Sequence, residues 1–328
     1  MRKSVLIIGA NGRLGQALAH AFLAAGWRVM GQVRHNPLPV GVLRDVVLIH
    51  VAADDPSELA TAAGAADVVI HAANPPYPLW KSEALPLAKD AIETAKRLGA
   101  LLMFPGNVYN FGSRMPEILL ESTAAQPTAR KGKIRVDIEN ALREAARAGL
   151  RAVIIRAGDF FGGPGRGAWL DTVIAKPLRK GRIVYPGPLD RIHAWAYLPD
   201  LARVFVMVAE RRSALPVFET LHFGGHAATG QALLDALARS ARRLSLIDAN
   251  ADVRAASMPW ALIRVGGMVV PMWRELAEMR YLWDVPHRLS GERLQRLIGS
   301  PPSTTLDAAM DATLQELFGQ RATPRRGA

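Results

Sequence analysis

Short apolar runs alternate with helix-like stretches along the first half of this 328-residue chain, and this alternation restricts the fold more than any other feature. It predicts strands at Val5–Ile8, Arg28–Val33, Val46–Val51, Val68–Ala72, Leu101–Phe104 and Ala152–Ile155. The helices expected between them are Leu14–Ala25, Ser57–Ala63, Glu83–Leu98 and Ile134–Ala148. Strands joined through helices lie parallel, and right-handed crossovers cover both faces of the sheet. We therefore expect a doubly wound α/β fold.

The pattern changes after the glycine-rich segment 162–167. Further strands are expected at Arg182–Tyr185, His193–Leu198 and Phe218–Phe223, with helices at Pro199–Glu210 and Thr229–Arg243. The stretch from Met258 to Phe318 is typical of helices broken by prolines. We expect residues 1–165 to form the sheet domain, with 190–224 returning to it. Residues 166–189 and 225–320 would then form a smaller, mainly helical substrate-binding region, and 321–328 a disordered tail.

The composition argues against several classes of protein. The chain has no cysteine, which excludes disulfides and cysteine-based sites, and its histidines and acids show no metal-ligand spacing. The formal net charge is +12, but the basic residues are scattered over several helices and do not indicate a nucleic-acid partner. No apolar segment is long enough for a membrane span or a signal sequence. We therefore expect a cytoplasmic protein with no metal and with neither a membrane nor a nucleic-acid partner.

The segment Gly9-Ala-Asn-Gly12-Arg-Leu-Gly15 follows the first expected strand and opens the first expected helix. In such a turn the first glycine permits the bend, the second lets the backbone approach a pyrophosphate, and the third lets helix and strand pack closely. The helix N-terminus adds unpaired N–H groups and a favourable dipole. The sequence therefore predicts a dinucleotide-binding Rossmann domain. The residues expected at the phosphates are Gly9, Asn11, Gly12, Arg13, Leu14 and Gly15.

Four later segments fit the same family pattern in order: Val68–Asn74, Asn107–Tyr109, Ile155–Gly162 and Trp195–Ala202. With the glycine spacing, they make residues 3–235 resemble the extended branch of the short-chain dehydrogenase/reductase superfamily, the NAD(P)-dependent epimerases and dehydratases. The resemblance implies a nicotinamide dinucleotide that crosses the sheet beside Ala72, Ala73 and Asn74. It also implies a small-molecule substrate. A homodimer is one of the expected states, because related folds often dimerise through helices.

The choice of dinucleotide depends on the residue that ends the second strand. NAD-binding domains of this kind carry an acid there for the ribose 2′-hydroxyl, whereas NADP-binding domains carry an arginine for the 2′-phosphate. Here Arg34 takes the position, and Arg13 in the glycine loop is expected to reach the same phosphate. The sequence therefore predicts NADP(H), with NAD as the alternative. The other interpretation of Arg34 is a solvated residue at the end of a strand.

The catalytic residues implied by the resemblance are replaced. Members of the superfamily carry Tyr-x-x-x-Lys on the helix after the fifth strand, and a Ser or Thr at the end of that strand. When Glu139 is matched to the acid that follows the pair, Lys131 takes the tyrosine position and Arg135 the lysine position. Counting back from Tyr109 places Pro105 at the Ser/Thr position. Any proton donor must therefore be of a different type.

Three residues are candidates for the chemistry. Lys131 and Arg135 lie four apart, so on a helix they share a face and could form a cationic pocket for an anion or oxyanion. A solvated basic helix start is the alternative. Tyr77, after the fourth strand, could touch the substrate or nicotinamide, since loops at the carboxyl ends of strands line such sites. A packed loop aromatic is the alternative there.

Two functions remain open at this point. The first is an NADP(H)-binding, epimerase/dehydratase-like oxidoreductase that acts on a small, anionic or sugar-type carbonyl or hydroxyl compound with a non-standard proton donor. The second is an NADP(H)-binding sensor or regulatory protein without catalysis. The replaced catalytic residues favour the second, whereas the glycine loop fits both.

Overall fold

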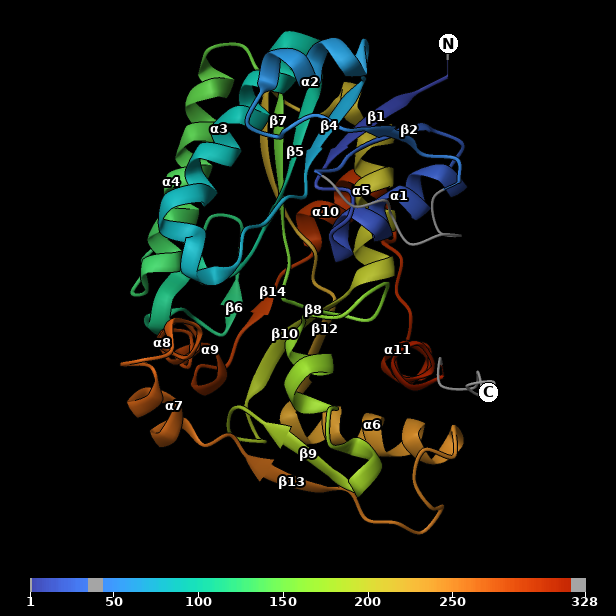
Figure 1. The fold of residues 1–328 in the computed structure, drawn as a ribbon, viewed down its shortest axis with the longest axis vertical. Coiled ribbons are helices and arrows are strands. Elements are labelled where there is room, and N and C mark those ends of the chain that lie inside the picture. Colours follow the sequence, from blue (N-terminus) through green and yellow to red (C-terminus); the bar gives the residue numbers. More distant parts are fainter. Residues whose placement is uncertain (1, 35–43, 320–328) are drawn as a thin grey trace, which may run out of the picture.

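The structure is a computed structural model that describes residues 2–34 and 44–319. The tail expected to be disordered, 321–328, lies outside the described residues. The chain forms a larger sheet lobe and a smaller lobe below it (Figure 1).

A seven-stranded sheet of wholly parallel strands forms the larger lobe, in the order β11-β7-β5-β4-β1-β2-β3. The strands are β1 (Ser4–Ile8), β2 (Arg28–Gln32), β3 (Val47–Ile49), β4 (Val68–His71), β5 (Leu101–Gly106), β7 (Ala152–Arg156) and β11 (Phe218–His222). The order changes direction between β1 and β4, and ligands bind beyond the carboxyl ends of strands at such a point. The doubly wound α/β fold expected from the sequence is confirmed.

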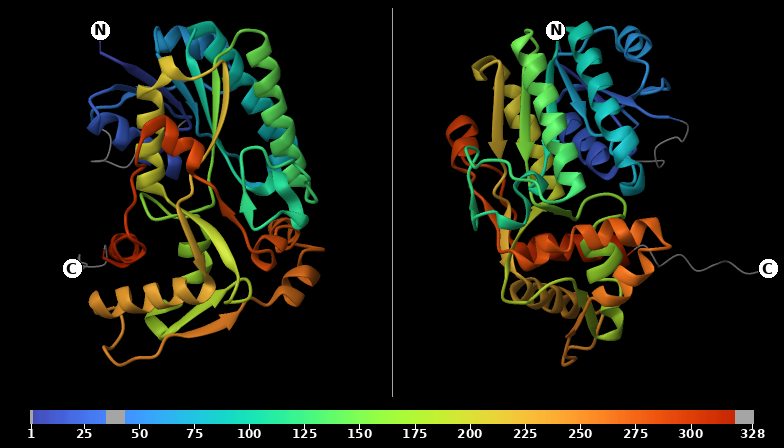
Figure 2. Two further views of the ribbon diagram at one scale, coloured as in Figure 1. Left: turned by 180° about the vertical axis from the view of Figure 1, so that it is seen from behind. Right: turned by 90° about the vertical axis from the view of Figure 1, so that its left-hand side faces the viewer.

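Helices cover both faces of this sheet (Figures 1 and 2). On one face lie α1 (Arg13–Ala24), α5 (Leu198–Glu210) and α10 (Glu292–Ile298). On the other lie α2 (Pro56–Ala63), α3 (Trp80–Leu98) and α4 (Arg130–Arg147). All five residues of β1 are buried, with Val5 and Ile7 in one core cluster and Leu6 and Ile8 in the other. Successive side chains of a strand face opposite sides, which is why Val5–Ile8 are apolar at every position of a strand that is covered on both faces.

The smaller lobe contains more strand than the sequence predicts. A three-stranded sheet joins β8 (Asp159–Phe161), β10 (Ile192–Tyr197) and β12 (His226–Thr229), and β9 (Arg182–Tyr185) pairs with β13 (Arg254–Ser257). Its helices are α6 (Gly230–Arg243), α7 (Trp260–Gly266), α8 (Pro271–Glu278), α9 (Tyr281–Asp284) and α11 (Leu306–Phe318). The extra strands are short and polar at several positions, so they lack the apolar run by which a strand is recognised.

The end of the chain returns to the larger lobe before α11. The short strand β14 (Arg288–Leu289) pairs with β6 (Ile118–Leu119), and α10 packs against β11 and α5. The sequence analysis assigned this segment to the substrate-binding region, whereas the structure places it against the sheet lobe. In the described ranges, none of the helices has the length and apolar character needed to cross a bilayer.

Candidate functional site

The glycine loop joins β1 to α1 at the change of strand order, and its glycines have different surroundings. Gly9 has a φ of +82°, and a Cβ there would lie 2.6 Å from the Cα of Ala73. A Cβ on Gly15 would lie 2.3 Å from the carbonyl oxygen of Gly9. A Cβ on Gly12 would meet only that same oxygen, at 3.3 Å. Packing therefore requires the first and third glycines, whereas the second borders open space.

The start of α1 is open to an anion. Among the described residues no side chain caps this helix, and its first turn carries no acid. The leading N–H groups of a helix lack partners inside the helix, and its dipole favours negative charge there. Leu14 is buried beneath the loop, and the carbonyl of Asn11 accepts a hydrogen bond from the Gln16 side chain at 2.8 Å. The loop is thus a formed cradle for a phosphate group.

Gln32 holds the glycine loop in place through hydrogen bonds, and it is not among the residues expected from the sequence. Its side-chain oxygen accepts the Gly9 N–H at 3.1 Å, and its side-chain nitrogen donates to the Val51 carbonyl at 2.7 Å. The residue is buried at the end of β2. A buried amide with both ends bonded holds the loop to the ends of β2 and β3.

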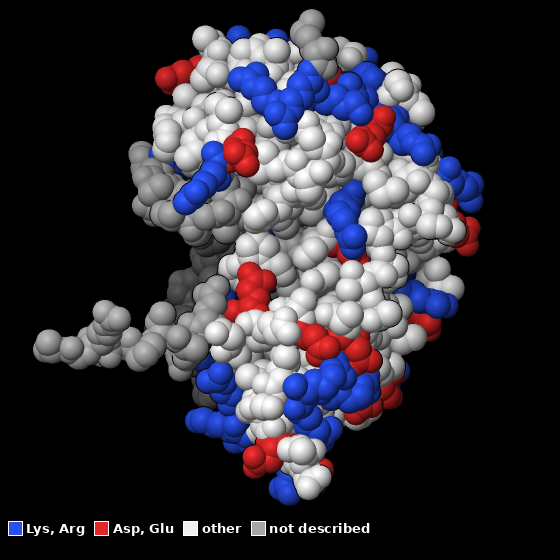
Figure 3. Space-filling view, turned by 90° about the vertical axis from the view of Figure 1, so that its right-hand side faces the viewer, with Lys and Arg blue, Asp and Glu red and all other residues white. Residues whose placement is uncertain are grey.

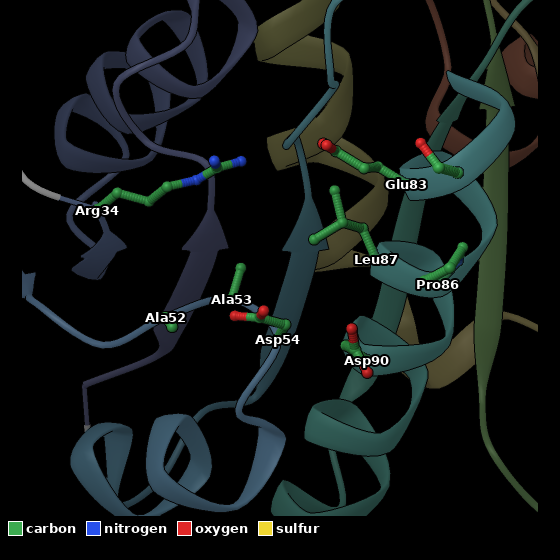
Figure 4. Close-up of a pocket in the computed structure, with 9 residues that line it drawn as sticks. Arg34, Ala52, Ala53, Asp54, Glu83, Pro86, Leu87 and Asp90 are labelled. Atoms are coloured by element: carbon green, nitrogen blue, oxygen red, sulfur yellow. The ribbon is translucent and has the colours of Figure 1, made fainter. Parts of the chain in front are cut away.

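Arg34 faces a cavity beside the loop (Figure 4). The cavity has a volume of about 390 Å³ and is lined by Arg34, Ala52, Ala53, Asp54, Ser82, Glu83, Pro86, Leu87 and Asp90. Arg34 enters it from the end of β2, and Glu83 and Asp90 enter it from α3. Burial and then the charge of Asp54 raise the pKa of Asp90. The cavity therefore offers one guanidinium among several carboxylates.

The structure does not bring Arg13 together with Arg34. The guanidinium of Arg13 donates to the Gly162 carbonyl at 2.9 Å and pairs with Asp171 at 3.3 Å, both in the segment that leads into the smaller lobe. Asp171 also accepts the N–H groups of Gly167 and Ala168. Arg13 thus connects the glycine loop to the 162–171 segment.

The three residues that follow β4 differ in exposure. Ala72 is buried and donates its N–H to the Ile8 carbonyl at 2.9 Å. Ala73 is half-buried against Gly9, and Asn74 is exposed. The structure thus places all three beside the glycine loop, at the carboxyl edge of the sheet.

Lys131 is buried at the start of α4 and is fully engaged in ion pairs. Its ammonium lies 2.5 Å from a carboxylate oxygen of Glu275 and 2.7 Å from one of Glu278, and it donates to the Glu275 carbonyl at 3.0 Å. Both acids belong to α8 of the smaller lobe. The same ammonium lies 5.1 Å from the centre of the Tyr77 ring. Lys131 thus joins α4 to α8 and supports Tyr77, instead of facing open solvent.

Arg135 lies one turn further along α4 and sits between aromatic rings. Its guanidinium is 4.7 Å from the Trp80 ring and 5.3 Å from the Phe104 ring, and it donates to the Pro105 carbonyl at 3.3 Å. Burial lowers its pKa. Its Nε atom is buried with no hydrogen-bond partner among the residues that the structure describes. The fixed guanidinium therefore keeps an unused donor.

Tyr77 and Tyr109 form a hydrogen-bonded pair beside Arg135. Their phenolic oxygens lie 2.9 Å apart. Tyr77 begins a 3₁₀ turn after β4, and Tyr109 begins another after β5, so the carboxyl ends of adjacent strands bring the rings together. Burial raises the pKa of Tyr77 to about 12, and it holds the pKa of Tyr109 well above its ordinary value of 10. Both phenols therefore keep their protons at neutral pH.

Asp159 and His193 form a second pair near these tyrosines. Nε2 of His193 lies 2.8 Å from a carboxylate oxygen of Asp159, and the His193 ring stacks on Trp283 at 4.3 Å. The charge of Asp159 contributes to the raised pKa of Tyr77. Neither residue is among the three catalytic candidates that the sequence offers. The available signal was an acid three residues beyond a strand that ends at the site.

Glu139 fixes α4 on the sheet. It accepts two hydrogen bonds from the Arg156 guanidinium, at 3.0 and 2.6 Å, and both residues are buried. Such a bidentate pair sets the register of α4 against β7. In the described part of the chain, no group of three histidines or acids could hold a metal ion.

Comparisons with known proteins concern the family and the fold. A model of the NAD dependent epimerase/dehydratase family matches residues 5–224. No curated protein sequence matches the chain.

Several solved structures share the fold. A putative epimerase from Burkholderia cenocepacia J2315 is 19% identical, with a TM-score of 0.77 and coverage of 97% of this chain and 98% of that one. A UDP-glucose-4-epimerase from Stenotrophomonas maltophila, solved with bound NAD and formylated UDP-arabinopyranose, is 14% identical, with a TM-score of 0.77 and coverage of 98% and 100%. A UDP-glucose 4-epimerase from Bifidobacterium longum in complex with NAD+ and UDP is also 14% identical, with a TM-score of 0.74 and coverage of 97% and 99%. At these identities the likeness concerns the fold.

Proposed function

The chain belongs to the NAD dependent epimerase/dehydratase family, and on that premise we propose that it is an NADP(H)-dependent oxidoreductase with a tyrosine pair as proton donor. Its substrate would be a small carbonyl or hydroxyl compound of sugar-type or anionic character. The observation that carries this proposal is the Tyr77–Tyr109 hydrogen bond beside Arg135, at the carboxyl ends of β4 and β5.

The cofactor side of the proposal rests on the glycine loop. The open space before Gly12 and the uncapped start of α1 suit a pyrophosphate, with Ala72, Ala73 and Asn74 beside its path. Arg34 in its cavity suits the 2′-phosphate of NADP. The carboxylates in the same cavity suit ribose hydroxyls, so the preference over NAD depends on Arg34 alone.

The chemistry follows from the protonation of the tyrosines. When bound, the dinucleotide supplies or accepts a hydride at the substrate carbon. A carbonyl oxygen gains negative charge as hydride reaches its carbon, and the Tyr77 hydroxyl gives it a proton. Tyr109, bonded to Tyr77, gives it a proton in turn, and water then returns a proton to Tyr109. The free donor of Arg135 stabilises the charge that develops on the oxygen.

Lys131 acts in this proposal as a positioning residue. Its ammonium has three acceptors within 3.0 Å, so it has no proton directed at a substrate. By joining α4 to α8 it fixes the Tyr77 ring, and loss of this support would slow turnover without removing the donor.

A regulatory protein that binds NADP(H) without catalysis is the second candidate. The observation that favours it is the ion-pair cluster of Lys131 with Glu275 and Glu278, which neutralises the cation at a helix position next to the site. The two candidates differ in whether NADPH is consumed.

One experiment separates them. Wild-type protein and Tyr77→Phe are incubated with NADPH and a panel of nucleotide sugars, aldehydes and 2-oxo acids, and absorbance of the reduced cofactor is followed. The oxidoreductase proposal expects turnover with at least one compound in the wild type and a large loss in the variant. Tight NADPH binding by calorimetry without any oxidation would establish the regulatory candidate instead.

A further inference from the structure

The turn between α7 and α8 exposes an unusual amount of apolar surface. We call residues 258–274 the apolar hairpin; α7 and α8 pack together within it. Met268 and Val269 at its tip are 79% and 84% exposed, and Leu262 and Val265 on α7 are 59% and 62% exposed. Exposed apolar groups gathered in one place mark a surface that contacts a partner or a membrane.

The hairpin is an ordered projection. A Cβ on Gly266 would lie 2.3 Å from the Trp273 ring, so the two arms touch closely. The N–H groups of Met268, Val269 and Val270 all donate to carbonyls of the preceding turn. At its base the Trp260 indole N–H donates to the Pro186 carbonyl at 2.6 Å. In Figure 1 the turn lies at the outer edge of the smaller lobe and points away from the body.

The charges on the hairpin have one sign. Between Asp252 and Glu275 the sequence contains no acid, and its charged residues there are Arg254, Arg264 and Arg274. All three are exposed. Glu275 is buried and held by Lys131, so its charge is already compensated. Other parts of the surface carry charges of both signs: on the described part of the face in Figure 3, acidic and basic side chains lie interspersed.

We propose that the apolar hairpin docks on the surface of an anionic lipid bilayer. An apolar tip with flanking arginines and no acid matches both layers of such a surface, the acyl region and the negatively charged headgroups. The sequence predicts no membrane partner, but that prediction rests only on the lack of a segment long enough to span a bilayer. Docking requires no span, since a few apolar side chains enter the interface while the rest of the protein stays in water.

The position of the hairpin gives this docking a consequence. α8 contacts the turn that carries Tyr77, and Glu275 of α8 pairs with Lys131. A docked hairpin therefore holds the candidate site close to the membrane surface. The inference does not depend on the proposed reaction, and its test needs no substrate.

The absence of cysteine permits a direct test. Met268→Cys in the full chain is labelled with an environment-sensitive fluorophore, and Val217→Cys, at a site 51% exposed on the sheet lobe, is the matched control. Vesicles contain phosphatidylcholine alone or with about three-tenths phosphatidylglycerol. We expect a blue shift at position 268 with the anionic vesicles only, and none at position 217. No shift at 268, an equal shift at 217, or an equal shift with neutral vesicles would overturn the proposal.

A second variant tests the charges separately. Arg264→Gln with Arg274→Gln should weaken co-sedimentation with the anionic vesicles by about thirtyfold, from about fivefold for each arginine near such a surface. Unchanged sedimentation would show that these two arginines do not contribute to binding and would contradict the proposed role of the anionic headgroups. The alternative partner of the hairpin is a second copy of the chain, and analytical ultracentrifugation tests for it. A dimer that Met268→Asp dissociates, together with a blue shift at position 268 in the absence of vesicles, would assign the hairpin to a dimer interface.

Discussion

The phenolic oxygens of Tyr77 and Tyr109 lie 2.9 Å apart although 32 residues separate them in the chain. Tyr77 begins a turn in the segment that follows β4, Tyr109 begins one in the segment that follows β5, and these two strands are neighbours in the sheet. The pair therefore occupies the edge where parallel sheets of this class bind their ligands.

The first prediction concerns this pair. Tyr77→Phe should lower kcat by about a hundredfold, because a proton donor is lost, while NADP(H) affinity stays nearly unchanged. Tyr109→Phe should have a smaller effect, since it leaves the donor in place. Steady-state rates and calorimetry measure both quantities. Tyr197→Phe in the smaller lobe is the control, and wild-type turnover in Tyr77→Phe would remove the tyrosine from the reaction.

The second prediction concerns the choice of dinucleotide. NADP(H) should bind at least tenfold more tightly than NAD(H), about 1.4 kcal/mol, because Arg34 faces the cavity. Arg34→Ala should remove this preference and leave NAD(H) affinity unchanged. Titration calorimetry decides it, with Arg28→Ala at the opposite end of β2 as the control. Equal affinities in the wild type would contradict the assignment to NADP.

The third prediction separates two glycines of the same loop. Gly12→Val should abolish dinucleotide binding in a folded protein, because the Cβ would have a single close neighbour, the Gly9 carbonyl oxygen at 3.3 Å, and the side chain would occupy the space proposed for the pyrophosphate. Gly15→Val should prevent stable folding, because its Cβ would lie 2.3 Å from a carbonyl oxygen. Circular dichroism and calorimetry on both variants test this. A folded Gly12→Val protein that still binds would mean that the phosphate site lies elsewhere.

The fourth prediction concerns the ion pairs of Lys131. Lys131→Met should lower the free energy of unfolding by about 1.5–3 kcal/mol, because it removes the buried cation from Glu275 and leaves that carboxylate only its ion pair with Arg130. Adding Glu275→Gln should restore part of the loss. Urea unfolding of the single and double variants gives the coupling energy. A loss of stability in the double variant equal to the sum of the two single losses would show that the two residues are not coupled.

The fifth prediction concerns acid. Burial alone would raise the pKa of Glu275, but the hydrogen bonds and charges of Lys131 and Arg130 together outweigh it and hold the pKa below the ordinary 4.5. A carboxyl whose pKa is lower in the folded state stabilises the fold above 4.5 and loses that effect as the pH falls through its folded pKa. Wild-type stability should therefore drop below pH 4.5, and Glu275→Gln should drop less. Parallel slopes for the two proteins would contradict the assignment.

The sheet could be predicted from the sequence because its evidence is local. A buried run of four or five apolar residues and the glycine spacing are both legible without knowledge of distant contacts. The same holds for the placement of Lys131 and Arg135 one turn apart on α4. What these two side chains contact could not be predicted, since Glu275 lies 144 positions beyond Lys131 on a short helix.

The pairing of Asp159 with His193 was hidden for a similar reason. The two residues lie 34 positions apart on short strands of the smaller lobe, whose pairing depends on tertiary contacts. The apolar hairpin was hidden differently. Its residues resemble core positions in the sequence, and only their exposure in the structure distinguishes them.

The contact of Arg13 with Asp171 links the glycine loop to the segment that leads into the smaller lobe, and it gives the two lobes a shared ion pair. Arg13 opens α1 at the phosphate cradle, yet its guanidinium is held by the segment that leads into the smaller lobe. A ligand that alters this ion pair from one side changes the binding equilibrium on the other side by the same factor, because linkage is reciprocal. Phosphate binding at the glycine loop and the orientation of the smaller lobe would both act on the side chain of Arg13.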